Sequence, residues 1–140
     1  MLLLSQWALL GFVAWTMLLV VCGIGAPRIT AVMRKQARPN SFNPALVHGS
    51  ERYQRTMRAH ANCVENLPIF AALVLLGSVV GVPGWQFQAA AIIVLPARVL
   101  QTVVHVASGR NRAVLARFVF FTVQLVCFFV MTVQLALHAL

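Results

Sequence analysis

The sequence predicts an all-α integral membrane protein, an up-down bundle of four helices. Hydrophobic residues make up 61% of the 140 residues and charged residues only 9%, too few for the water-exposed surface of a soluble domain of this size. The apolar residues also gather in long runs without charge, at 1–27, 66–97 and 118–140. A helix crosses about 30 Å of hydrocarbon with about 20 such residues, and a helix satisfies its backbone groups within the segment.

The helix positions follow from where these runs begin, end and break. The first run extends to the first basic residues, and Pro27 can kink its helix near the end. The segment 35–56 is polar and rich in turn formers, so it is expected to be a loop. The run 66–97 would be about 48 Å long as one helix, and the turn at 81–84 (Gly-Val-Pro-Gly) breaks it. We therefore expect a single transmembrane domain, residues 1–140, with helices at about 2–34, 58–80, 85–107 and 112–138.

The basic residues predict the topology. The formal charge is +9. Seven of the eleven basic residues lie between Arg28 and Arg58 and three between Arg110 and Arg117, whereas the turn at 81–84 has none. Basic loops stay on the cytoplasmic side of a membrane, so both termini are expected on the opposite side. Because the basic residues flank apolar spans, no nucleic-acid partner is expected.

Polar side chains form a stripe on the second predicted helix. Arg58, Asn62 and Glu65 are spaced i, i+4, i+7 and share one helical face, and Asn66 widens the stripe. Glu65 is the only acid in any predicted span, and an ionised carboxylate there must be paired or hydrogen-bonded.

A second stripe, formed by Arg98, Gln101 and His105, lies on the third predicted helix. Arg98 or Arg58 is the natural partner of Glu65. One interpretation is an ion pair that fixes the register of the two helices. We favour a ligand site, because ionisable residues within membranes are usually functional and two stripes exceed the needs of one ion pair. The excess of arginine favours an anionic ligand with carboxylates, and the lone Glu65 would suit an ammonium group on the same ligand. A compact molecule with two carboxylates and one amine fits this pattern.

The run 58–70, Arg-Ala-His-Ala-Asn-Cys-Val-Glu-Asn-Leu-Pro-Ile-Phe, resembles the second-helix signature of the MAPEG family, the membrane-associated proteins of eicosanoid and glutathione metabolism. That signature is Arg-Ala-(His/Gln)-x-Asn-x-x-Glu followed by proline and an aromatic residue. The resemblance extends to shorter stretches elsewhere, at 34–35, 42–44 with 48–49, 97–105 and 111–113.

The resemblance implies a homotrimer that binds glutathione as co-substrate between subunits, near the cytoplasmic face and without a metal. The implied activity is a membrane-bound glutathione-dependent transferase or peroxidase acting on hydrophobic or lipid-derived electrophiles. An arginine at the start of the fourth helix would stabilise the glutathione thiolate. The local Asn-Arg-Ala match indicates Arg112, with Arg117 in reserve because the preceding turn varies in length. The glutathione-binding residues that the resemblance and the two stripes indicate are Arg34, Arg58, His60, Asn62, Glu65, Asn66, Arg98, Gln101 and His105.

The sequence departs from the family at several positions. The eicosanoid enzymes often place tyrosines beside the second-helix glutamate and on the third helix, where this chain has Asn66, Gln101 and His105. A non-catalytic member that binds and presents a lipid is therefore the alternative function. A transporter or a structural subunit is less favoured, because no repeat or pair of discontinuous helices is visible. His60 points about 200° away from Arg58 and is expected to face another helix or a neighbouring subunit.

Overall fold

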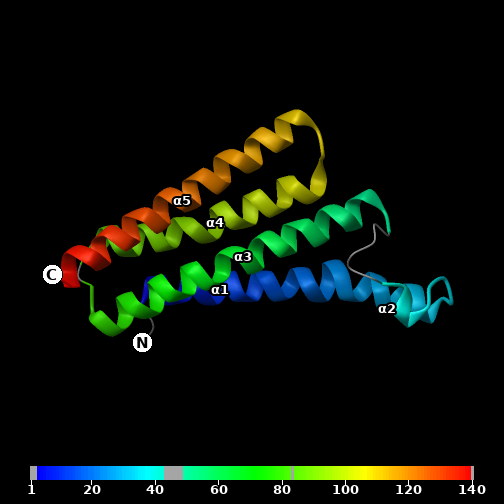
Figure 1. Ribbon diagram of the computed structural model, residues 1–140, viewed down its shortest axis with the longest axis horizontal. Helices are drawn as coiled ribbons and strands as arrows, with labels where there is room; N and C mark the ends of the chain where they lie inside the picture. Colours follow the sequence, from blue (N-terminus) through cyan, green and yellow to red (C-terminus); the bar gives the residue numbers. More distant parts are fainter. Residues whose placement is uncertain (1–2, 43–48, 83, 140) are drawn as a thin grey trace.

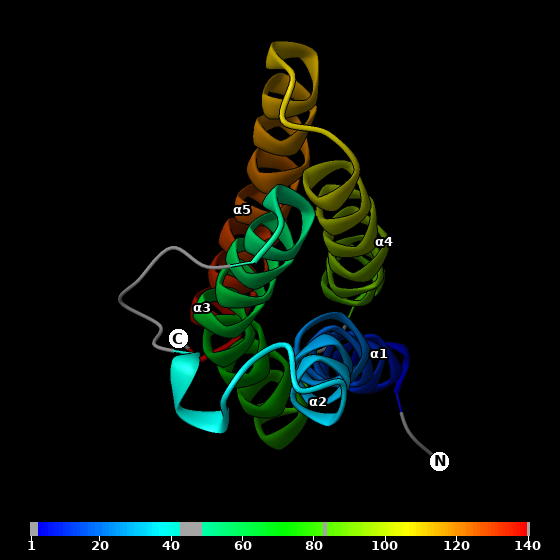
Figure 2. The same ribbon diagram turned by 90° about the vertical axis from the view of Figure 1, so that its right-hand side faces the viewer.

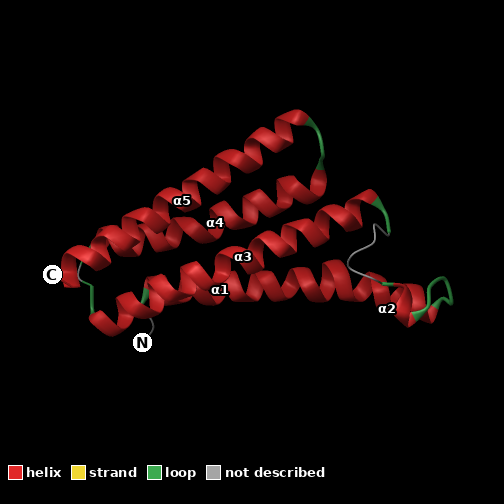
Figure 3. Ribbon diagram, in the orientation of Figure 1, coloured by secondary structure: helices red, strands yellow, loops and turns green. Residues whose placement is uncertain are grey.

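The computed structural model describes residues 3–42, 49–82 and 84–139 of the chain. All regular secondary structure in this part is helical (Figure 3). The α-helices are α1 (Leu4–Leu18), α2 (Ala26–Met33), α3 (Glu51–Val80), α4 (Trp85–Ala107) and α5 (Asn111–Ala139), with a π-helical segment η1 (Leu19–Gly25) and a short 3₁₀ helix η2 (Pro39–Ser41).

Four helical rods are long and apolar enough to cross a membrane, namely Leu4–Met33, Glu51–Val80, Trp85–Ala107 and Asn111–His138. They run up and down as an antiparallel bundle (Figure 1), which confirms the predicted layout of four helices. Large apolar side chains such as those of Val79 and Phe129 are exposed on its outside, as expected of a surface that faces lipid.

The first rod is continuous through α1, η1 and α2. Pro27 lacks an N–H group, so the α-helical hydrogen bond at this point is lost. The chain winds into a π-helix just before the proline, and the Ala26 N–H bonds to the Val21 carbonyl five residues back. This local unwinding is a known way for a helix to accommodate such a defect, and it lies directly before Pro27, where the sequence predicted a kink.

α3 begins at Glu51, about two helical turns before the start expected near Arg58. Ser50 caps the helix, because its hydroxyl accepts a hydrogen bond from the Tyr53 N–H at 3.2 Å. Glu51 lies in the first turn, where a negative charge is favourable, and pairs with Arg55 at 3.4 Å. The end of the predicted loop is therefore helical, and this prediction was wrong by seven residues.

The two basic segments lie at one end of the bundle, and the two termini lie at the other with the turn after α3 (Figure 1). Gly81 ends α3 in the left-handed conformation with φ +73°, which confirms the predicted break. Viewed from the basic end, α4 and α5 form a pair beside α3 and the first rod (Figure 2). Both basic segments thus flank the same end of the predicted polar stripes.

The core lies along the bundle axis. The rings of Phe12 and Phe70 are 5.7 Å apart and those of Phe70 and Phe128 are 6.0 Å apart, so three rods meet at one aromatic cluster. Towards the turn after α3, Gly77 faces Phe87, and a Cβ atom at Gly77 would lie 2.8 Å from Phe87 Cε1. The absence of a side chain at Gly77 therefore lets α3 and α4 pack closely.

Candidate functional site

A cavity of about 500 Å³ opens between α3, α4 and α5. Its volume is in the range of small-molecule sites. Its lining has a polar part and an apolar part. The polar part is Asn62, Glu65 and Asn66 from α3, Gln101 from α4 and Arg117 from α5, and the apolar part is Ile69, Val114, Phe118, Phe121 and Leu125.

The polar part of the cavity contains five of the residues that the sequence singled out. Asn62, Glu65 and Asn66 line it together because they share one face of α3, and the Asn66 side chain donates to the Asn62 carbonyl at 2.8 Å. Gln101 reaches it from α4 and donates from Nε2 to the Arg117 carbonyl at 3.3 Å. Members of both predicted stripes therefore meet at this cavity.

The cavity holds one acid and one arginine. Glu65 is exposed within the single chain and Arg117 is partly exposed. Within residues 3–42, 49–82 and 84–139 the one salt bridge joins Arg55 and Glu51, so Glu65 pairs there with neither Arg58 nor Arg98. Both a carboxylate and a guanidinium are consequently available to a ligand in the same cavity.

Arg117 lines this cavity, whereas Arg112 does not. Arg112 is exposed in the first turn of α5. Arg117 lies five residues further along, or about 7.5 Å, where α5 has reached α3 and α4. The position therefore supports the reserve arginine of the sequence analysis in place of the first choice.

His105 and Arg58 lie on the basic side of the cavity without lining it. His105 is buried, and the positive charges of Arg117, Arg58 and Arg55 act on it electrostatically. Arg55 also donates to the Val106 carbonyl at 3.2 Å, which holds the start of α3 against the end of α4. This end of the site is strongly positive.

Arg98 lies inside the bundle and does not line the cavity. Its side chain is 1% exposed and its guanidinium lies 5.2 Å from the centre of the Phe12 ring. Its Nε and Nη2 atoms have no hydrogen-bond partner among the described residues. Although Arg98 and Gln101 are neighbours on α4, Arg98 faces α1 and Gln101 faces α5, so the expected contact of Arg98 with a ligand of this cavity is not supported.

Arg34 and His60 are not brought to the cavity within one chain. Arg28 bonds to Tyr53 and Met57, which places these residues at one level of the antiparallel rods. From this level Arg34 lies six residues towards the basic end and Asn62 about seven residues towards the other end, so the two are separated by roughly 20 Å along the axis. A single ligand could contact both only if they came from two copies of the chain.

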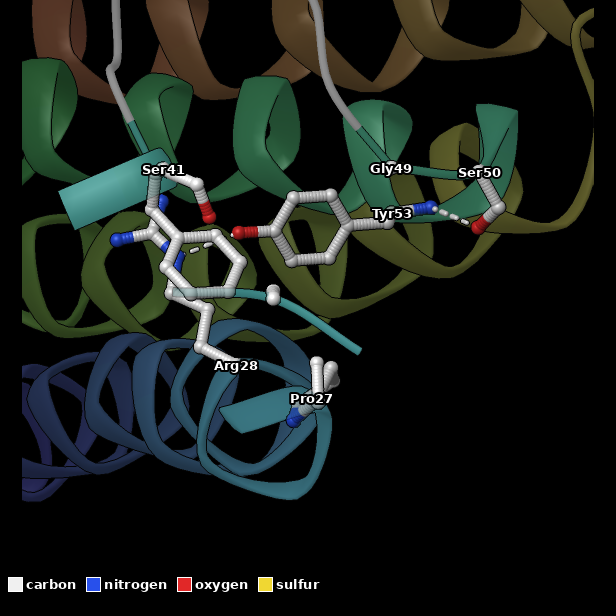
Figure 4. A pocket seen from close by; sticks show the side chains of 9 residues that line it. Pro27, Arg28, Ser41, Gly49, Ser50 and Tyr53 are labelled. Atoms are coloured by element: carbon white, nitrogen blue, oxygen red, sulfur yellow. Dashed lines mark hydrogen bonds between the residues drawn. The ribbon is translucent and has the colours of Figure 1, made fainter. Parts of the chain in front are cut away.

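A second cavity, of about 420 Å³, lies between α2, η2 and the start of α3 (Figure 4). Arg28 Nε donates to the Tyr53 hydroxyl, and the guanidinium lies 5.3 Å from the Phe42 ring centre and 5.9 Å from that of Tyr53. Its one charged group among the described lining residues is thus already engaged. This cavity is a weaker candidate for binding an anion.

Gln124 and the apolar lining were missed in the sequence. Val114, Phe118, Phe121 and Leu125 recur at helical spacing on the Arg117 side of α5, a pattern that could have indicated them once Arg117 was chosen. Gln124 is an amide inside an apolar span, which is itself a signal of function. It is fully buried and donates to Gln101 Oε1 at 3.1 Å.

The chain was compared with sequence models of known protein families. The sequence model described as the MAPEG family matches residues 12–137, a range that includes part or all of each rod and every residue of the cavity. No curated protein matches the chain.

Proposed function

The chain belongs to the MAPEG family, and from this premise we propose that it is a membrane-bound glutathione-dependent transferase or peroxidase. The observation that carries the proposal is the presence of Glu65 and Arg117 in one cavity, neither of them paired with another described residue. Glutathione has an amine, two carboxylates and a thiol. Its ammonium group suits Glu65, and its thiolate or a carboxylate suits Arg117.

Arg117 would activate the thiol by electrostatics. A thiol with a pKa of about 8.5 is mostly protonated at neutral pH, and an adjacent guanidinium favours the thiolate. The proton leaves to solvent. The thiolate sulfur then forms a bond to the electrophilic carbon while the leaving group departs with its electron pair.

A hydrophobic electrophile would reach the thiolate from the apolar part of the cavity. Phe118, Phe121 and Leu125 extend this part along α5, and Phe118 and Leu125 are exposed on the outside of the single chain. A lipid-soluble substrate can therefore approach from the membrane. With a lipid hydroperoxide, two glutathione molecules are oxidised to the disulfide while the hydroperoxide is reduced to an alcohol and water.

A homotrimer would complete the site. Arg34 is too far from Asn62 within one chain to contact the same small ligand, and Glu65 is exposed on the bundle surface. Both features are explained if a neighbouring subunit covers the cavity and contributes Arg34. We place the basic end, and with it the cavity, on the cytoplasmic side, following the charge of the two basic segments.

A conjugation assay tests the proposal. Purified protein in detergent, shown by its sedimentation to be trimeric, is mixed with glutathione and a model aryl halide or a lipid hydroperoxide. We expect glutathione-dependent turnover above the rate without protein. A folded trimer without such turnover would reject the enzymatic function.

The second candidate is a non-catalytic member that binds a lipid and presents it to a partner. It is favoured by one feature of the cavity, whose described lining contains no hydroxyl side chain. Catalysis would therefore lack a hydroxyl donor beside the thiol. Binding of a lipid without formation of a glutathione thiolate would support this function over catalysis.

A further inference from the structure

Gln124 is a buried amide that the proposed chemistry does not use. Its side chain is 0% exposed and does not line the cavity. Its Oε1 atom has no hydrogen-bond donor among the described residues, and an unsatisfied buried carbonyl is unfavourable for folding. A leucine would avoid this cost but would leave Gln101 Oε1 without its donor, so the contact with Gln101 is the feature to explain.

The two N–H groups of Gln124 have well-defined acceptors. Gln124 Nε2 donates to the Phe120 carbonyl at 2.8 Å and to Gln101 Oε1 at 3.1 Å. Because a backbone carbonyl can only accept, the Phe120 contact fixes which end of the Gln124 amide is the nitrogen. The same nitrogen then requires an oxygen from Gln101.

This contact also fixes the orientation of Gln101. With its oxygen facing Gln124, its nitrogen faces the opposite way and donates to the Arg117 carbonyl at 3.3 Å. A flipped Gln101 amide would place a donor against the Gln124 nitrogen and an acceptor against the Arg117 carbonyl. The Gln101 nitrogen carries a second N–H, for which the structure of the described chain provides no acceptor, and Gln101 lines the cavity.

We propose that Gln124 is a positioning residue that holds the Gln101 carboxamide as a hydrogen-bond donor towards an anionic group of the ligand, beside Arg117. The Phe120 carbonyl fixes the orientation of the Gln124 amide, and the Gln124 amide in turn fixes that of Gln101 at the cavity wall. Without Gln124, only the 3.3 Å bond to the Arg117 carbonyl still orients the Gln101 amide. The amide then presents its oxygen, which repels an anion, for a larger share of the time. This role rests on the proposed binding of glutathione.

Glutathione binding to the purified trimer tests this role. Gln124→Leu removes one unsatisfied carbonyl but leaves Gln101 Oε1 without its donor, so its folding is checked by thermal unfolding. The folded trimer should bind glutathione about fivefold to tenfold more weakly, which is the effect of losing one oriented hydrogen bond. Gln134→Leu is the matched control, since Gln134 lies on the same helix and lines no part of the cavity. Its affinity should equal that of the wild type.

A double-mutant cycle separates positioning from a general structural effect. If Gln124 acts through Gln101, then Gln124→Leu should have no further effect on affinity in a Gln101→Leu background. Additive losses would overturn the role, as would an unchanged affinity in Gln124→Leu alone. A wild-type protein that binds no glutathione would overturn the proposed function and this role together, so the two failures are distinguishable.

Discussion

Arg98 and Gln101 lie three residues apart on α4, yet they belong to opposite kinds of environment. Arg98 is sealed between α1 and α4 under the Phe12 ring, whereas Gln101 faces α5 and lines a cavity with a free acid and arginine. Both looked alike in the sequence, as polar residues in an apolar span. The helix that packs against a polar side chain therefore decides, more than the residue type does, whether that side chain can contact a ligand.

The largest expected effect is at the cavity that Gln101 lines, where Arg117 of α5 supplies the positive charge. Arg117→Ala should lower kcat/KM for glutathione conjugation by about a hundredfold, because the charge that stabilises the thiolate is lost. Arg112→Ala is the control and should stay within about threefold of the wild type, since an exposed charge contributes little. Steady-state kinetics with a model aryl halide measure both, and the reverse ranking would return the role to Arg112.

Packing between α3 and α4 should affect stability alone. Gly77→Ala should destabilise the fold by about 1–3 kcal/mol, because its Cβ would collide with the Phe87 ring. Thermal unfolding in detergent measures the change, and Phe87→Leu should partly restore the lost stability. Glutathione affinity of the folded fraction should not change, and a variant that unfolds like the wild type would show that this contact is loose.

Glu65→Gln should weaken glutathione binding by about tenfold, because the amide keeps the shape but removes the partner of the ammonium group. Equilibrium titration of the purified trimer measures this affinity. A glutathione analogue without the amine should bind the variant and the wild type alike. Equal affinity of both proteins for glutathione itself would remove Glu65 from the site.

The smallest expected effect is at Arg98, which is buried inside the bundle. Arg98→Met should change glutathione affinity by less than about twofold and should keep or raise the midpoint of thermal unfolding, because burying a cation is costly and Arg98 forms no salt bridge among the described residues that the substitution would break. The same titration and melting assays apply. A tenfold loss of affinity with an intact fold would place Arg98 in the site after all and would break the contrast with Gln101.

The sequence predicted the helices well because charge and apolar length decide them. The runs without charge located four rods, and Gly81 ended the second of them as expected. The start of α3 was missed because Ser50 and Glu51 form a capping signal inside a segment read as a loop. In a polar segment, such a local signal outweighs the lack of apolar residues.

The candidate site was predicted in part. Helical spacing grouped Arg58, Asn62 and Glu65 with Asn66 beside them, because residues on one helix face are identified without knowing the neighbouring helices. All of these except Arg58 line the cavity. Spacing could not separate Arg98 from Gln101, because both lie within one broad polar face and the difference is which helix packs there. The choice between Arg112 and Arg117 depends on how far α5 runs before it meets α3, which the turn before α5 sets.

The central claim is that Arg117 stabilises a glutathione thiolate in the cavity, and ultraviolet thiolate absorbance tests it most directly. Glutathione is titrated at neutral pH into the purified wild-type trimer and into Arg117→Ala. We predict a saturable thiolate signal in the wild type that is lost in Arg117→Ala while the trimer remains intact. A wild-type protein without the signal, or a variant that retains it in full, would contradict the account.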